Sequence, residues 1–122
     1  MLKTFFYIIN LLFITFYLYP GSIMGFILYQ DFNKQPQLTN DFSLSLLEFS
    51  SNHVYSFFVI SIFGLIIFLK KNIKIYLFSI SIILETLHII IPNRSFQFSD
   101  LNGNLLGVVI AITFFYIYEY FK

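Results

Sequence analysis

The sequence predicts an all-α polytopic membrane protein, a four-transmembrane-helix bundle. Of the 122 residues, 58% are hydrophobic and only 11% are charged, whereas soluble globular domains carry about 25% charged residues. Four apolar runs, at residues 4–20, 54–69, 75–91 and 104–121, approach the roughly 17 to 25 residues that span a bilayer. Backbone groups in hydrocarbon must be bonded within their own segment, and the alternation of a small β-barrel is missing, so these runs are predicted to be helices. The chain is predicted to form one membrane domain, residues 1–122.

The first apolar run is interrupted, because it resumes after Pro20 and Gly21 and continues over residues 22–29. Proline breaks or kinks a helix, so we expect a break near Pro20. The sequence leaves open whether residues 21–29 continue the first helix or re-enter the membrane. Lys3 followed by an apolar core also fits a signal peptide, but Tyr17 stands where a cleavage site needs a small residue, so we expect retention in the membrane.

The segment 30–52 is predicted to be an outward loop with a short interfacial element. Its first part is polar and rich in turn residues, and residues 41–49 then alternate between apolar and polar before ending in LLEF. Extending the second span back to Asp41 would give a helix of roughly 43 Å, longer than the hydrocarbon core. We therefore expect a break near Asn52, with Ser51 or Asn52 as the N-cap of the second span.

The positions of the basic residues predict the orientation of the chain. In a four-span arrangement, five lysines fall on one side of the membrane, while Lys34 and Arg94 fall on the other. The five are Lys3, Lys70, Lys71, Lys74 and Lys122. Because cytoplasmic loops carry an excess of Lys and Arg, both termini are predicted to be cytoplasmic, in a multi-pass protein of the bacterial cytoplasmic (inner) membrane.

Polar residues gather at the outward end of the third span. Ser81, Glu85 and His88 are spaced i, i+4 and i+7, so they share one helix face. Such groups in hydrocarbon are retained mainly where they face a cavity, pair with each other or bind a ligand. The alternative is that a protonated Glu85 and its neighbours only join helices by hydrogen bonds worth about a kcal/mol each. His53 begins the second span, where it either reaches this group or is incidental.

Arg94 is expected in the outward loop, because Pro92 is predicted to end the third helix. It is predicted either to pair with Asp100 or Glu85, or to present its planar guanidinium to a phosphate or carboxylate of a lipid head group. Ser99 or Asp100 is the candidate N-cap of the fourth helix.

The start of the fourth span carries an amide and a stripe of small residues. Asn104 lies below the predicted cap and needs a hydrogen-bond partner. Small residues follow at i, i+4 and i+8, which lets another helix approach closely, and the third span is the expected partner. These are Gly103, Gly107 and Ala111.

Several chemistries have little support in the sequence. Glu85-x-x-His88 is half of the pairing used by di-metal carboxylate bundles, but only one such motif is present. A site for one metal ion would have to recruit His53 or Asp100, so no metal and no cofactor are expected. No cysteine is present, which excludes disulfides, thiolate ligands and a Cys nucleophile. The net charge of +1 gives no indication of nucleic-acid binding.

The segment ILETLHIIIPNRSFQFSDLNGNLLGVVIA resembles the signature of VanZ-like membrane proteins. The residues that match this signature position by position are Glu85, Arg94, Asp100, Asn104 and Gly107, and His53 matches a histidine that opens an upstream helix. The resemblance runs from Asn52 to the C-terminus, with Pro20 as a weaker match. His88 departs from the glutamine that is frequent in the family, and an Asp-Lys pair before the histidine is absent from FSSNH. The resemblance implies an integral membrane protein of a family associated with resistance to the glycopeptide teicoplanin.

The leading hypothesis is that the chain is a VanZ-like protein with an outward-facing polar site. This site would bind a lipid head group or a cell-envelope precursor. Its candidate ligand-binding residues are Arg94, Glu85, Asp100, Asn104 and His53. If the site is catalytic, Glu85, His88 or His53 is the candidate general base. The competing hypothesis is a non-enzymatic structural or accessory membrane subunit in which the same residues form an internal packing network. A proton path has thinner support, because one carboxylate lies within the spans. The sequence assigns no oligomeric state.

Overall fold

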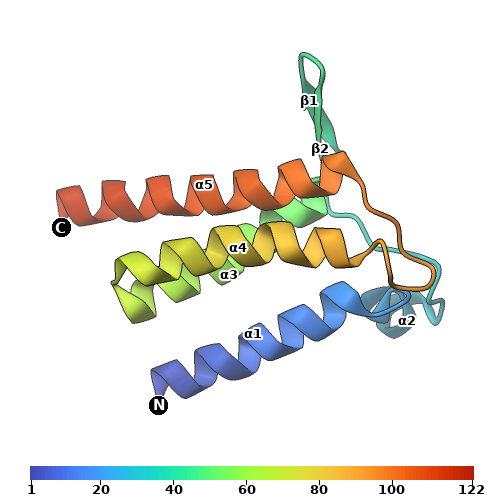
Figure 1. Cartoon of the computed structure of the whole chain (residues 1–122), viewed down its shortest axis with the longest axis horizontal. Helices are drawn as coiled ribbons and strands as arrows, with labels where there is room; N and C mark the ends of the chain where they lie inside the picture. The colour runs from blue at the N-terminus through green and yellow to red at the C-terminus, as the bar shows by residue number, and fades with distance from the viewer.

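The computed structural model describes residues 1–122 and is mostly helical, with 68% of the residues in five helices. The helices are α1 (Leu2–Leu18), α2 (Ile23–Tyr29), α3 (Ser51–Phe68), α4 (Lys71–Leu87) and α5 (Phe98–Phe121). Two short strands, β1 (Phe42–Leu44) and β2 (Leu47–Phe49), form an antiparallel hairpin between α2 and α3. Figure 1 shows α1, α3, α4 and α5 side by side, with α2 and the hairpin at one end of this group.

The structure contains two or three candidate membrane spans. Helices α3 and α5 are long and apolar enough to cross a membrane, and α1 with α2 makes a third candidate if this bent pair is one span. Large apolar side chains are exposed along the outer faces of the helices, for example Leu11, Ile66, Ile83 and Ile117. Water would disfavour so much exposed apolar surface, whereas lipid accommodates it. The apolar helices therefore support membrane insertion, and the fourth span stays a prediction.

The predicted break near Pro20 is confirmed. Helix α1 ends at Leu18, α2 begins at Ile23, and the two helices are bent by 85°. Ser22 caps α2, because its Oγ accepts a hydrogen bond of 2.9 Å from the N–H of Gly25. Residues 23–29 thus form a separate short helix that turns sharply away from the direction of α1.

Helix α4 ends earlier than predicted. Its last residue is Leu87, whereas the predicted third span ran to residue 91 and was expected to end at Pro92. Residues 88–90 leave the helix through i to i+3 bonds, the first from the N–H of His88 to the carbonyl of Glu85 at 3.1 Å. Such bonds tighten a final turn and satisfy carbonyl groups at a helix end. The prediction that Pro92 ends the helix is therefore wrong.

The predicted caps of the second and fourth spans are also wrong. Helix α3 is preceded by Ser50, and Asp41 accepts a hydrogen bond of 2.9 Å from the N–H of Ser51. A carboxylate from a distant loop thus satisfies the helix start in place of Ser51 or Asn52. Helix α5 begins at Phe98 and its N-cap is Gln97, not Ser99 or Asp100, so Asp100 lies in its first turn.

The predicted interfacial element within residues 30–52 contains the β-hairpin. Phe42 pairs with Phe49 and Leu44 with Leu47, so one face of the hairpin is apolar. Phe49 is buried at the base of the hairpin, beside α5. Figure 1 shows the hairpin projecting sideways from the helices, across their axes. The alternation in the sequence therefore corresponds to paired strands.

The glycine stripe of α5 packs against α3. A Cβ atom added to Gly103 would lie 2.6 Å from the carbonyl oxygen of Ser50, and one added to Gly107 would lie 2.5 Å from that of Val54. Ala111 is fully buried farther along the same helix. The prediction of a close approach is correct, but the predicted partner, the third span, is wrong. The stripe holds α5 against the second predicted span.

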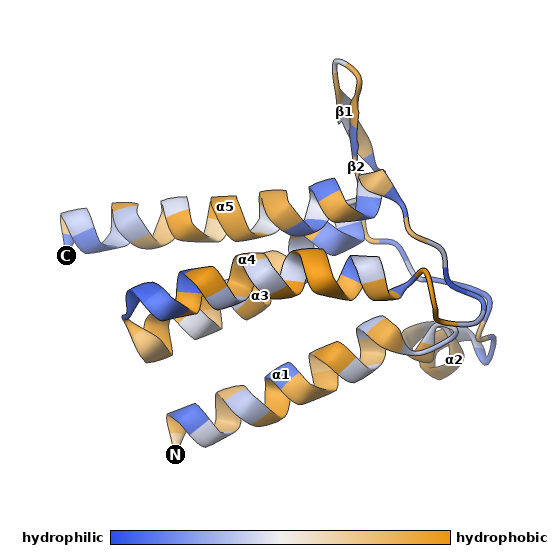
Figure 2. Cartoon of the chain, viewed as in Figure 1, coloured by the Kyte–Doolittle hydropathy of each residue, from blue (hydrophilic) through white to orange (hydrophobic).

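The two ends of the bundle differ in character. Figure 1 shows both termini and the turn between α3 and α4 at one end, and α2, the hairpin and the loop after α4 at the other. In Figure 2, hydrophilic colouring is concentrated in the connections at the end away from the termini, apart from the start of α4. Lys34 and Arg94 lie in these connections. The polar site predicted from the sequence is therefore at the end opposite the termini.

Candidate functional site

The side chains at this end form one hydrogen-bonded network that joins four helices. Glu85 is at its centre and is fully buried, with a relative exposure of 0%. Its Oε2 accepts a hydrogen bond of 2.5 Å from the hydroxyl of Tyr17, and its Oε1 accepts one of 2.9 Å from the N–H of Gln97. One carboxylate therefore connects α1, α4 and the residue that precedes α5.

Asn104 connects α5 to the same network. Its Nδ2 donates to the carbonyl of Ser81 at 3.0 Å and to the hydroxyl of Tyr17 at 2.7 Å. Because a carbonyl only accepts, this contact fixes which end of the amide faces Ser81. The Oδ1 of Asn104 then lies 2.8 Å from Nδ1 of His53. This geometry requires a proton on that nitrogen.

His53 stands between the buried network and Asp100. Its Nδ1 carries a proton toward Asn104 and lies 3.1 Å from the hydroxyl of Tyr17. Its Nε2 lies 3.5 Å from Oδ2 of Asp100. The imidazole therefore links a carboxylate at the start of α5 to the hydroxyl that donates to Glu85.

His88 completes the buried group from the turn after α4. Its ring stacks on that of Tyr17, with centroids 4.8 Å apart and planes 18° apart. Nε2 donates to the carbonyl of Tyr17 at 2.9 Å, and Nδ1 lies 3.3 Å from Oε2 of Glu85. Two lone pairs would repel each other across that contact, so the Glu85–His88 pair holds a proton between these atoms.

Arg94 does not form an ion pair with Asp100 or Glu85, which was one of the two predicted alternatives. The ion pairs of the structure join His53 with Asp100, His88 with Glu85, and Lys122 with Glu119. Arg94 instead donates from Nε to the carbonyl of Tyr19 at 3.0 Å and from Nη2 to that of Tyr17 at 3.3 Å. Its charge is positioned by backbone carbonyls and is not neutralised by a carboxylate.

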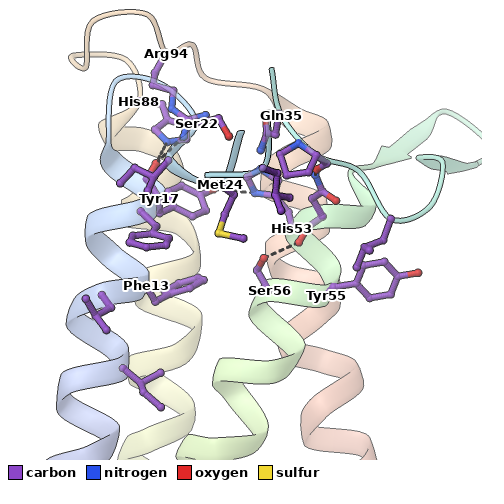
Figure 3. Close-up of a pocket in the computed structure, with 18 residues that line it drawn as sticks. Phe13, Tyr17, Ser22, Met24, Gln35, His53, Tyr55, Ser56, His88 and Arg94 are labelled. Carbon is purple, nitrogen blue, oxygen red and sulfur yellow. Dashed lines mark hydrogen bonds between the residues drawn. The ribbon is translucent and has the colours of Figure 1, made fainter. Parts of the chain in front are cut away.

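Two cavities of opposite character meet beside this network. The larger, about 620 Å³, lies between α1, α2 and α3, and more than half of its lining residues are hydrophobic. The smaller, about 250 Å³, has no hydrophobic lining residue. Figure 3 shows the lining of the larger cavity, with Phe13 low between the helices and with Arg94, His88 and His53 toward the loops. The residues that line both cavities are Gln35, Asn52, His53, His88 and Arg94.

Most of the predicted site residues are brought together. His53, Glu85, His88 and Asn104 belong to the buried network, Asp100 contacts it through His53, and Arg94 lines both cavities. The glycine stripe faces α3, where Gly103 packs against the side chain of His53, and it adds no polar group to the site. The sequence did not single out Tyr17, which contacts every member of the buried network. Nothing in its apolar, aromatic-rich surroundings distinguishes it from the other eight tyrosines.

Three of these side chains also offer potential metal-ligand atoms that lie close together. One ligand atom from each of His53, Glu85 and Asp100 lies within 4.8 Å of the others. Nitrogen and carboxylate oxygen are ligands that zinc accepts. Both oxygens of Glu85 already accept hydrogen bonds, from Tyr17 and from Gln97. A cation would have to share these oxygens with the two donors, and the expectation of no metal stays a prediction.

Comparisons with protein-family models, with curated proteins and with solved structures find no match to this chain.

Proposed function

We propose that this protein is a VanZ-like, four-span protein of the bacterial cytoplasmic membrane that binds a lipid head group or a cell-envelope precursor at its outward end. The observation that carries the proposal is the position of Arg94. Its guanidinium lines a wholly polar cavity and has no carboxylate partner. A planar guanidinium is suited to a phosphate or carboxylate, which it binds by paired hydrogen bonds.

The neighbouring groups suit a head group that also carries hydroxyl or amine functions. Asp100, Gln97 and Ser95 line the polar cavity together with Arg94. Arg94 holds the anionic group in this proposal, and Asp100 accepts a hydrogen bond from a hydroxyl or an amine. Glu85 does not contact the ligand in this proposal, and its contacts fix the positions of Tyr17 and His88. Its role is to hold the site in shape.

The distribution of charge supports an outward orientation of the cavity. The lysines at positions 3, 70, 71, 74 and 122 lie near the termini or at the start of α4, at the end opposite the cavity. An excess of positive charge favours the cytoplasmic side. In this proposal the termini lie in the cytoplasm and the cavity lies at the outer surface.

Complementation of a deletion strain tests this proposal. Arg94→Ala and Glu85→Gln would be expressed separately, and teicoplanin susceptibility, lipid composition and membrane abundance would be measured together. We expect both variants to lose the phenotype of the wild type while Arg94→Ala keeps normal abundance. Full complementation by Arg94→Ala would contradict the proposal.

A second candidate function is that of a structural or accessory membrane subunit. The full hydrogen bonding of Glu85 favours it, because every acceptor oxygen of that carboxylate is used inside the protein. In this case the network only fixes how the helices pack. Loss of abundance in step with loss of phenotype, in both variants, would select this function over ligand binding.

A further inference from the structure

The larger cavity has the shape and lining of a hydrocarbon site. Besides Tyr17, its α1 wall is formed by Ile9, Leu12, Phe13 and Phe16, which are spaced i, i+3, i+4 and i+7 on one helix face. This face extends about 10 Å along the helix at 1.5 Å per residue. The volume, about 620 Å³, falls within the range of roughly 300 to 1,000 Å³ that is usual for ligand sites.

The same cavity is open to the outer surface of the helices. Leu12 on α1 and Tyr55 on α3 both line it, and their relative exposures are 53% and 42%. In Figure 3, Arg94 and His88 lie beside the connecting loops, Phe13 lies below them, and Tyr55 lies on the side of α3 away from α1. In a membrane, this outer surface faces lipid, so a hydrocarbon chain can enter sideways between the two helices.

The charged end of the cavity gives the direction in which a ligand lies. His53, His88 and Arg94 line both the apolar cavity and the polar one. Of these, Arg94 carries a full charge and forms no ion pair with a carboxylate. An amphiphile with an anionic head therefore fits with its head beside Arg94 and its chain along α1, which satisfies both linings at once.

We infer that the ligand is a membrane lipid with an anionic phosphate head group, which enters between α1 and α3 and places one hydrocarbon chain against Leu12 and Phe13. This inference rests on the proposed function and deepens it by naming the class of ligand. Arg94 binds the phosphate. The apolar cavity supplies the part of the affinity that a water-soluble phosphate cannot obtain.

Lipid retention by the purified protein tests the inference. The wild type and its variants are incubated in detergent micelles that contain equal amounts of phosphatidylglycerol and phosphatidylcholine, and bound lipid is counted by native mass spectrometry. We expect the wild type to retain phosphatidylglycerol in preference to phosphatidylcholine. Arg94→Gln keeps amide donors for the carbonyls of Tyr17 and Tyr19 but removes the charge, and it should weaken phosphatidylglycerol binding by about tenfold or more.

A matched pair of substitutions tests the cavity itself. Ser56 lines the cavity, Thr113 lies on the exposed face of α5, and each hydroxyl donates to the carbonyl four residues earlier. Ser56→Trp should fill the cavity and abolish lipid retention, whereas Thr113→Trp should retain lipid like the wild type. Equal helix content in the two variants, measured by circular dichroism, shows that Ser56→Trp folds.

The outcomes separate this inference from the proposed function. If Ser56→Trp retains phosphatidylglycerol and Arg94→Gln loses it, the proposed site for the hydrocarbon chain is wrong. The head-group site at Arg94 then stands. Displacement of the lipid by an equal concentration of glycerol 1-phosphate would likewise overturn the role of the hydrocarbon chain. Equal retention by the wild type and by all three variants would overturn both proposals.

Discussion

The hydroxyl of Tyr17 donates a hydrogen bond of 2.5 Å to Oε2 of Glu85, which joins α1 to α4 across a buried interface. The same hydroxyl accepts from Asn104 of α5 and lies close to His53 of α3. One phenol oxygen therefore contacts polar groups from the three other long helices. Such a group orders the end of the bundle at which the two cavities meet.

Removal of this hydroxyl should destabilise the protein. In Tyr17→Phe, both Glu85 and Asn104 lose a partner while they remain buried, and an unsatisfied buried polar group costs about 1–3 kcal/mol. Thermal unfolding in detergent, followed by circular dichroism, should show a lower midpoint. Tyr7→Phe is the matched control, because Tyr7 is an exposed tyrosine of the same helix. Equal midpoints for the two variants would contradict the central place of Tyr17.

A methyl group at position 107 should separate α5 from α3. The added Cβ would lie 2.5 Å from the carbonyl oxygen of Val54, which is backbone and cannot turn aside. Gly107→Ala is expected to lose about 1–3 kcal/mol of stability, even though alanine favours a helix over glycine by about 1 kcal/mol. Gly21→Ala is the control, since its nearest contact would be 3.4 Å. A Gly107→Ala protein more stable than the wild type would contradict this packing.

The orientation of the chain can be tested with single cysteines, because the natural sequence has none. Ser43 is exposed in the hairpin, and Asn72 is exposed in the first turn of α4, at the opposite end. A membrane-impermeant maleimide should label Ser43→Cys in intact cells and should label Asn72→Cys only after lysis. The reverse pattern would place the cavity on the cytoplasmic side.

Zinc should not bind stoichiometrically to the cluster of His53, Glu85 and Asp100. Both oxygens of Glu85 accept hydrogen bonds from within the protein, and a cation would have to share these oxygens with the donors. Protein purified in the presence of zinc should contain far less than one ion per chain by elemental analysis. A ratio near one that falls in His53→Ala would refute this expectation and make the cluster a metal site.

The residues of the polar network that lie on one helix could be predicted from their spacing in the sequence. The i, i+4 and i+7 spacing placed Ser81, Glu85 and His88 on a common face, and all three are buried. Of the two alternatives for Arg94, the ion pair with Asp100 or Glu85 does not form, because backbone carbonyls receive its hydrogen bonds. Charge alone does not reveal which acceptors the fold brings near.

The arrangement of the helices was less predictable. The glycine stripe indicated a close approach, but small residues accept any neighbouring helix, and nothing in their spacing selects α3 over α4. The alternation in residues 41–49 indicated an interfacial element, while strand pairing depends on the turn at Ser45, where φ is 58°. Tyr17 acquires its role only from the partners that three other helices bring to it.

Ligand-dependent stabilisation of the wild type and Arg94→Gln tests the central claim, that Arg94 holds an anionic lipid head group, most directly. A ligand that binds only the folded state, at about 100 times its dissociation constant, adds about 2.7 kcal/mol of stability. Phosphatidylglycerol added to phosphatidylcholine-containing micelles should therefore raise the thermal midpoint of the wild type and leave that of Arg94→Gln nearly unchanged. An equal rise in both proteins would contradict the claim.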